Sequence, residues 1–175
     1  MLIALTGMPG SGKTTVGRIL ADALGCPFMD LDELIEKKAG KPIPQIFAED
    51  GEAAFREWEG KQLKQTVSKY AGADAVLALG GGSVCLPGAA QLLQDKTLCI
   101  YLRASVDTLA ARLQGASGRP LLSGTAPSQL EALTATLTAL LAGREALYEQ
   151  AAHVTLDTDG VTPEAIADEI IISVL

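Results

Sequence analysis

The sequence predicts an α/β fold in which a parallel β-sheet is covered by helices on both faces. Short apolar runs of strand length alternate with longer amphipathic stretches along the whole chain. The apolar runs are nearly continuous, which is typical of strands that are buried on both faces. Successive parallel strands require crossover connections, and these are right-handed. The predicted strands are residues 2–6, 28–30, 75–79, 97–102 and 153–156.

The stretches between these strands have helical character. Leucines recur near helical spacing in the last long stretch, at Leu133, Leu137, Leu140 and Leu141. A chain of 175 residues can bury one sizeable core and is too short for two ordinary domains. We therefore expect a single domain over residues 1–175. The predicted helices are residues 16–24, 33–38, 51–70 and 129–150.

Composition excludes several classes of function. The formal net charge is −7, so the chain lacks the broad basic surface of a nucleic-acid-binding protein. An anionic ligand must therefore be held by a local site. No apolar run of transmembrane length and no leader peptide is visible, and the three cysteines, an odd number, share no metal-ligand spacing. We expect a cytoplasmic protein, monomeric, with no nucleic-acid or membrane partner.

The strongest motif follows the first predicted strand. Residues 7–14, Gly-Met-Pro-Gly-Ser-Gly-Lys-Thr, fit the pattern G-x-x-x-x-G-K-[ST] and precede a predicted helix. Such a loop points backbone N–H groups at phosphate oxygens, and the following helix adds its positive N-terminal end. Lys13 would contact the β- and γ-phosphates, and the Thr14 hydroxyl would bind Mg²⁺. The sequence contains no asparagine, and hence no N-K-x-D motif for guanine, so ATP is favoured over GTP.

Two carboxylates lie at the end of the second predicted strand. Asp30 and Asp32 are two residues apart, and strand alternation would place both side chains on the same side, at the carboxyl end of the sheet where ligands bind. One carboxylate could hold the metal's water shell, and the other could accept a proton from an acceptor hydroxyl. The alternative for Asp32 is a capping role ahead of the helix predicted at 33–38.

Three consecutive glycines, Gly80, Gly81 and Gly82, end the third strand. Their entropic cost implies close approach of the backbone to another group, or positive φ, although a flexible strand-to-helix turn is the simpler alternative. The chain has only six arginines, so the position of each is informative. Arg56 could bind a ligand or could form a solvated i,i+3 ion pair. Arg112 and Arg144 could be ordinary surface residues on helices.

A segment rich in glycine and small residues is the one candidate for a mobile lid. It covers residues 115–125 and includes Arg119-Pro120-Leu121-Leu122. Arg119 lies in this segment, where it could be an ordinary lid charge.

Together these residues resemble the shikimate kinase family, within the nucleoside monophosphate kinase-like group of P-loop proteins. The resemblance runs from the P-loop to the last helix. It includes the Asp-x-Asp pair, Phe55-Arg56-x-x-Glu59, the triple glycine, the Arg-Pro-Leu-Leu run and Arg144-x-x-x-Tyr148. It implies a three-layer fold with a five-stranded parallel sheet in the order 2-3-1-4-5, a lid, and a substrate-binding region at about residues 32–60.

The resemblance also implies a role for each site residue. ATP and shikimate would be the substrates, with Mg²⁺ as cofactor, and the product would be shikimate 3-phosphate in aromatic amino acid biosynthesis. Lys13, Asp32 and Arg119 would be catalytic, and Thr14 and Asp30 would serve the metal. The shikimate site would comprise Asp32, Arg56, Gly80, Gly81, Gly82 and Arg144. The ATP site would comprise Gly10, Ser11, Gly12, Lys13, Thr14, Thr15, Arg112, Arg119 and Asp157.

Two rival functions remain open at this point. Another small-metabolite kinase of the same group, such as a gluconate kinase, would share the P-loop. A nucleotide-dependent binding module would share the fold without transferring phosphate. The paired arginines and the triple glycine disfavour the first rival. The intact Lys13, Thr14, Asp30 and Asp32 disfavour the second.

Overall fold

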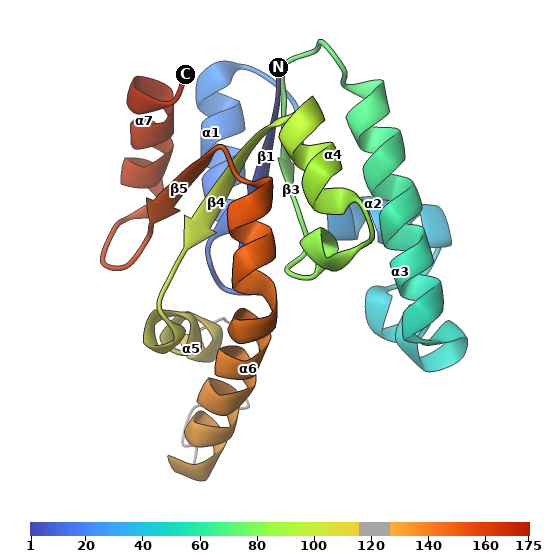
Figure 1. The fold of residues 1–175 in the computed structure, drawn as a ribbon, viewed down its shortest axis with the longest axis vertical. Helices are drawn as coiled ribbons and strands as arrows, with labels where there is room; N and C mark the ends of the chain where they lie inside the picture. The colour runs from blue at the N-terminus through green and yellow to red at the C-terminus, as the bar shows by residue number, and fades with distance from the viewer. Residues whose placement is uncertain (116–126) are drawn as a thin grey trace.

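The sheet has the predicted architecture. The computed structural model describes residues 1–115 and 127–175. Five parallel strands are arranged in the order β2-β3-β1-β4-β5, with helices on both faces (Figure 1). Each predicted strand is present; one differs from the prediction by one residue at one end, and two are shifted by one residue at both ends. The strands are β1 (Leu2–Thr6), β2 (Phe28–Asp30), β3 (Ala75–Ala78), β4 (Leu98–Arg103) and β5 (Val154–Asp157).

The helices are longer than periodicity alone predicts, because their first turns carry glycine, proline or polar residues. The long α3 is interrupted at Gly51, whose φ of 86° is not helical, and this break coincides with the predicted helix start. Pro44 lies in the first turn of α3, where its missing N–H is tolerated. The helices are α1 (Lys13–Leu24), α2 (Leu31–Ala39), α3 (Ile43–Lys69), α4 (Ala89–Lys96), α5 (Val106–Gly115), α6 (Pro127–Ala151) and α7 (Pro163–Ser173), with a short 3₁₀ turn, η1 (Ser83–Cys85).

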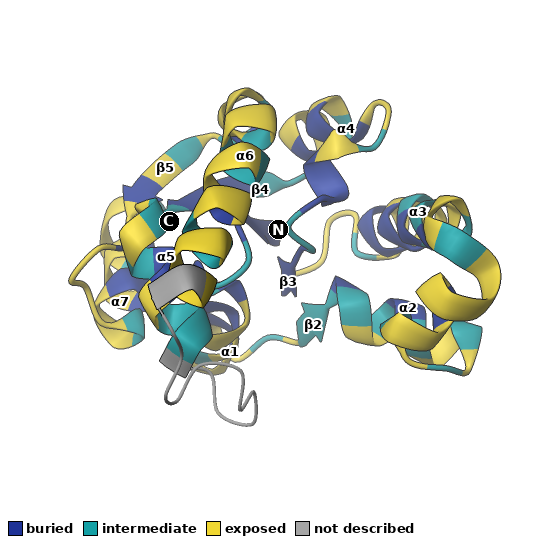
Figure 2. Ribbon diagram, turned by 90° about the horizontal axis from the view of Figure 1, so that it is seen from below, coloured by how far each residue is buried: buried dark blue, intermediate teal, exposed yellow. Residues whose placement is uncertain are grey.

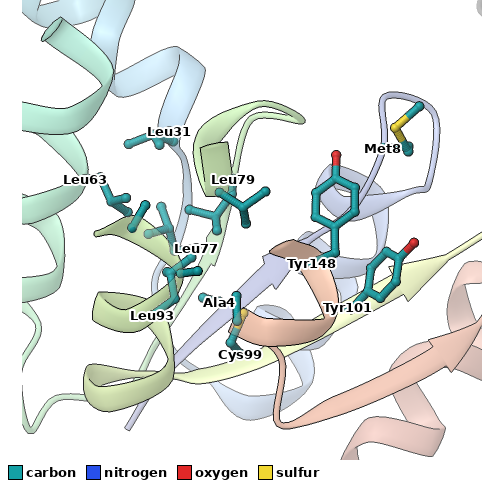
Figure 3. Close-up of a cluster of buried hydrophobic side chains, with 14 of the residues drawn as sticks. Ala4, Met8, Leu31, Leu63, Leu77, Leu79, Leu93, Cys99, Tyr101 and Tyr148 are labelled. Carbon is teal, nitrogen blue, oxygen red and sulfur yellow. The ribbon is translucent and has the colours of Figure 1, made fainter. Parts of the chain in front are cut away.

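Two apolar clusters lie on opposite faces of the sheet. On β1, Ile3 and Leu5 face the cluster that includes residues of α1 and α7, while Leu2 and Ala4 face the larger cluster with residues of α3, α4 and α6. Figure 3 shows part of the larger cluster, in which the rings of Tyr101 and Tyr148 lie next to each other. This alternation explains why the strands read as continuous apolar runs.

Helices α2 and α3 form a pair beside the β2 edge of the sheet (Figure 2). They pack against each other, and α2 begins directly where β2 ends. The pair therefore carries residues 31–69 next to the carboxyl ends of β2 and β3, where the candidate acceptor residues lie. None of the described helices is long and apolar enough to cross a membrane. The segment predicted as a lid lies, except for Gly115, outside the described residues.

Candidate active site

The glycine-rich loop between β1 and α1 forms a closely wound cradle. Gly10 and Gly12 have φ values of 84° and 96°, in the left-handed region that favours glycine. The Ser11 N–H donates to the Met8 carbonyl at 3.1 Å, which closes the turn. Gly12 is the N-cap of α1, so the positive end of this helix lies at the loop. The local geometry is that of an anion site.

Lys13 places a buried cation inside this loop. Its Nζ donates to the carbonyl oxygens of Gly7 at 2.8 Å and Met8 at 2.9 Å, and the residue is 9% exposed. Burial lowers the pKa of Lys13 to about 8, although Asp32 and Asp30 act in the opposite direction. An ammonium has three N–H donors, and two of them are used here. Among the described residues, the third donor has no hydrogen-bond partner.

Two hydroxyl groups in the cradle complete its polar lining. Within the described residues, the Ser11 Oγ is buried and has no hydrogen-bond partner. A buried unpaired hydroxyl is unfavourable, so the site offers a donor to an incoming oxygen. Thr14 Oγ1 donates to Asp30 Oδ2 at 2.9 Å, which places two hard oxygen atoms next to each other at the exposed edge of the loop.

Asp30 and Asp32 come together for a different reason from the predicted one. The expectation that both lie on one strand is wrong: β2 ends at Asp30, and Asp32 lies in the first turn of α2. The helical cap is Asp30, whose Oδ1 accepts from the N–H groups of Asp32 at 2.9 Å and Glu33 at 3.4 Å. The alternative that Asp32 is the cap is therefore wrong as well. The cap leaves the Asp32 carboxylate available to the site.

The Asp32 carboxylate lies in an environment that disfavours its charge. Desolvation raises its pKa to about 6, and the negative charges of Asp30 and Glu59 act in the same direction, whereas Lys13 opposes them. The carboxylate lies against the backbone of Gly80, where a Cβ atom would meet Asp32 Oδ1 at 3.2 Å. A carboxylate with a raised pKa is a better proton acceptor than an ordinary aspartate.

Each glycine of the triple-glycine turn makes room for a different polar group. A Cβ atom on Gly81 would lie 3.2 Å from Arg144 NH1 and 2.9 Å from Pro9 Cδ. On Gly82 it would lie only 2.8 Å from Arg56 NH1. The close approach inferred from the sequence is therefore confirmed, and the simple flexible turn is not a sufficient account. Two guanidinium groups, one from α3 and one from α6, meet the same turn.

A buried acid that sequence reasoning assigned no role holds one of these arginines. Glu59 is 1% exposed, accepts from Arg56 NH1 at 2.7 Å through one oxygen, and accepts from Ser83 Oγ at 2.9 Å through the other. Arg56 does form an i,i+3 ion pair, but its partner is buried rather than solvated. The motif Phe55-Arg56-x-x-Glu59 could have indicated this pair, since a helix places residues three apart on the same side.

Arg144 is joined to the turn by a neighbour one helical turn away. The Tyr148 hydroxyl donates to the carbonyl oxygen of Gly81, and the residue is fully buried. Burial raises the pKa of Tyr148 to about 12, and the nearby Arg144 guanidinium acts against this rise. Arg144 also lies near enough to Lys13 to lower the pKa of that lysine further. The groups at residues 13, 32, 56 and 144 therefore belong to one site.

A cavity of about 400 Å³ opens on the other side of the glycine-rich loop. Arg112 of α5 forms part of its lining, and its guanidinium donates to the Thr158 carbonyl at 2.8 Å and the Thr158 hydroxyl at 3.1 Å. The Asp157 carboxylate pairs instead with Arg103, with contacts of 2.6 and 3.0 Å. The lining consists of Gly10, Ser11, Gly12, Thr15, Val16, Arg112, Val161, Pro163 and Ile166.

The structure brings most of the predicted residues to these two adjoining places. Gly10 to Thr15 and Arg112 surround the cavity and the cradle, while Asp32, Arg56, Arg144 and the three glycines form the second region. Asp157 lies at the end of β5 and stays a prediction for the nucleotide site. Arg119 lies outside the described residues.

The fold and the site define a class of protein. A parallel sheet in the order 2-3-1-4-5, with a lysine-containing phosphate loop after its central strand and a second polar region beside it, is the architecture of a P-loop kinase.

Comparison with known proteins identifies the family. The family model "Shikimate kinase" matches residues 9–175. The chain is 45% identical over 160 residues to a shikimate kinase of Chlorobium chlorochromatii, which covers 90% of this chain and 82% of the relative. The chain belongs to the shikimate kinase family.

Solved structures agree with this assignment. A shikimate kinase from Acinetobacter baumannii in complex with shikimate superposes with a TM-score of 0.84 at 36% identity, over 97% of this chain and 90% of that one. A shikimate kinase from Bacteroides thetaiotaomicron gives a TM-score of 0.86 at 30% identity, over 97% and 96% of the two chains. The resemblance inferred from the motifs is thus confirmed.

Proposed function

We propose that this chain transfers the γ-phosphoryl group of ATP to the 3-hydroxyl of shikimate, giving shikimate 3-phosphate and ADP. The observation that carries the proposal is the triple-glycine turn, which receives one guanidinium at Gly81 and another at Gly82 beside the Asp32 carboxylate and Lys13. Two arginines suit a carboxylate substrate, because a guanidinium binds a carboxylate through two parallel hydrogen bonds. Shikimate carries such a carboxylate as well as hydroxyl groups.

The nucleotide occupies the cradle and the adjoining cavity. The phosphates accept from the backbone N–H groups of Gly12, Lys13 and Thr14, from the Ser11 hydroxyl and from the third N–H of the Lys13 ammonium. The adenine enters the cavity of about 400 Å³, between Arg112 and the apolar side chains of Val161 and Pro163. A planar guanidinium can stack on the base there.

Mg²⁺ fits at the edge of the cradle. Thr14 Oγ1 and Asp30 Oδ2 are 2.9 Å apart, and oxygen atoms are the ligands this ion prefers. Mg²⁺ in ATP sites is held by one or two protein oxygens together with phosphates and water, so a small donor set is sufficient. When bound, the ion neutralises charge on the β- and γ-phosphoryl oxygens. Asp30 also caps α2, which fixes its orientation.

The acceptor side orients shikimate and receives its proton. Arg56, held by the buried Glu59, and Arg144 bind the carboxylate, and the backbone of the glycine turn lies between them. The 3-hydroxyl oxygen attacks the γ-phosphorus while the bond from this atom to the β,γ-bridging oxygen breaks. Asp32 accepts the hydroxyl proton, and Lys13 stabilises charge on the transferring group and on ADP. The family resemblance implies that Arg119 acts on the transferring phosphate, and this role stays a prediction.

A coupled assay of ADP release tests the proposal. The assay is run with ATP and Mg²⁺ alone, with shikimate and with gluconate. We expect ADP release to depend on shikimate. Release that depends on gluconate would favour the rival metabolite kinase, and no release with either acceptor would favour a binding module.

A further inference from the structure

Tyr148 is a buried polar residue that the proposed reaction does not use. It lies on α6, one helical turn after Arg144, and its side chain is fully buried. Its ring stacks on Tyr101 of β4 with a centroid separation of 5.0 Å and an interplanar angle of 25°, so the ring is fixed between the sheet and the helix (Figure 3). A phenol with so little freedom holds its hydroxyl at a defined place.

That place is the meeting point of Arg144 and the glycine turn. The hydroxyl donates its proton to the Gly81 carbonyl, and the Arg144 guanidinium lies close enough to favour the ionised form of the phenol. A hydroxyl has one donor and two acceptor lone pairs. Because its donor is occupied by Gly81, it faces the guanidinium with its lone pairs. Arg144 NH1 in turn lies 3.2 Å from where a Cβ atom on Gly81 would be.

The two arginines of the site are held in different ways. The Arg56 guanidinium has a buried carboxylate partner, Glu59, at 2.7 Å. Arg144 has the Tyr148 hydroxyl as a neighbour, one turn further along α6. Arg144 projects from the long helix α6, and small rotations of this helix would move its guanidinium away from Gly81. A hydrogen bond from the same helix to the turn opposes such movement.

We propose that Tyr148 is a positioning residue for the acceptor carboxylate: its hydroxyl links Gly81 to Arg144 and keeps this guanidinium at the turn where shikimate binds. The inference rests on the proposed function, because the ligand of Arg144 is the acceptor. It adds a residue that acts through Arg144 rather than on the substrate.

Tyr148→Phe tests the inference, with Tyr101→Phe as a matched control. Both substitutions remove one hydroxyl from the same stacked and buried pair, but the bond to Gly81 comes from Tyr148. We expect Tyr148→Phe to raise the KM for shikimate by roughly threefold to tenfold, the range for one lost hydrogen bond. Its kcat and its KM for ATP should stay within about twofold of the wild type. Tyr101→Phe should leave all three constants within about twofold.

A second background separates positioning from a general structural effect. In Arg144→Lys, the guanidinium is already absent, so adding Tyr148→Phe should change the KM for shikimate by less than about twofold. An equal factor in both backgrounds would overturn the inference, as would an unchanged KM in Tyr148→Phe accompanied only by a lower melting temperature. If the wild type turned over without shikimate dependence, the proposed function would fall and this inference with it. Wild-type turnover with an unaffected Tyr148→Phe variant would overturn the positioning role alone.

Discussion

Asp32→Asn is expected to make the protein more stable while lowering its kcat. The substitution keeps the shape of the side chain but removes a negative charge from a site where desolvation, Asp30 and Glu59 all disfavour that charge. The pKa of Asp32 rises from 3.8 to about 6, net of the attraction from Lys13. A shift of about two units corresponds to at most roughly 3 kcal/mol, because each unit is worth about 1.36 kcal/mol. Solvent screens this partly exposed carboxylate, so we expect about half of that value.

The pH dependence of this gain follows from the direction of the shift. Above pH 6 the Asp32 carboxylate is ionised in both the folded and the unfolded chain. The whole free-energy cost of holding this charge in the folded site then lowers the stability of the wild type. Between pH 6 and pH 3.8 the folded protein binds the proton first, and the cost declines. We expect Asp32→Asn to exceed the wild type in free energy of unfolding by about 1.5 kcal/mol at pH 8 and by about 0.8 kcal/mol at pH 5.

Urea unfolding at the two pH values measures both quantities, with the slope m checked for constancy. Asp30→Ala is the control, because Asp30 caps α2 and accepts from Thr14. Its loss should lower the stability by about 0.5–2 kcal/mol. A variant Asp32→Asn that is less stable than the wild type at pH 8, or whose advantage is the same at pH 5, would refute the proposed environment of Asp32.

Four further predictions concern activity. Lys13→Ala should reduce kcat by about 10²–10³ with an unchanged far-ultraviolet circular dichroism spectrum, because one electrostatic donor is lost; near-normal turnover would contradict its role. Arg56→Lys should raise the KM for shikimate by about 10- to 150-fold and that for ATP by less than about twofold, since the bidentate contact is lost; equal effects on both would argue against a carboxylate contact. Asp30→Asn should need more Mg²⁺ and recover in excess metal, whereas Asp32→Asn should keep a low kcat at any Mg²⁺ concentration; the reverse pattern would exchange their roles. The pH profile of kcat/KM should rise near pH 6, where Asp32 ionises, and fall near pH 8, where Lys13 loses its proton; a flat profile over this range would count against both groups.

The sheet and the phosphate loop could be predicted because their signals are local. The strands are continuous apolar runs, and the eight residues from Gly7 to Thr14 carry both the turn glycines and the lysine within one segment. The backbone of such a loop needs residues with positive φ. Gly10 and Gly12 adopt such values, and the sequence shows that both positions are glycine. The strands and the helix after the phosphate loop therefore differ from the prediction only at their ends, whereas helices α4, α5 and α7 were not predicted.

The residues of the acceptor region could be predicted from the sequence, but the hydrogen bonds among them could not. Residues 30 and 32 were expected on one strand, and the strand ends between them because the Asp30 side chain caps the next helix. The capping oxygen and the N–H groups it accepts from are close in sequence, but the choice of which aspartate caps depends on where β2 leaves the sheet. Tertiary packing decides this, and local periodicity does not contain it.

The sequence also could not predict which single polar side chains are buried. Glu59 lies among charged residues on an amphipathic helix and would be expected in solvent, yet it is 1% exposed because Arg56 and Ser83 both donate to it. Ser83 is 24 residues away along the chain. Contacts at such separation follow from the sheet order and become visible only in the folded molecule.

Phosphorus NMR of the reaction product tests the central claim most directly. The protein is incubated with ATP, Mg²⁺ and shikimate, and the product is examined by ¹H–³¹P correlation. We predict a phosphate monoester whose phosphorus couples to the proton on C3 of the shikimate ring, formed in step with ADP. A phosphorus signal from inorganic phosphate alone, or one coupled to the proton of another ring carbon, would contradict the proposed transfer to the 3-hydroxyl.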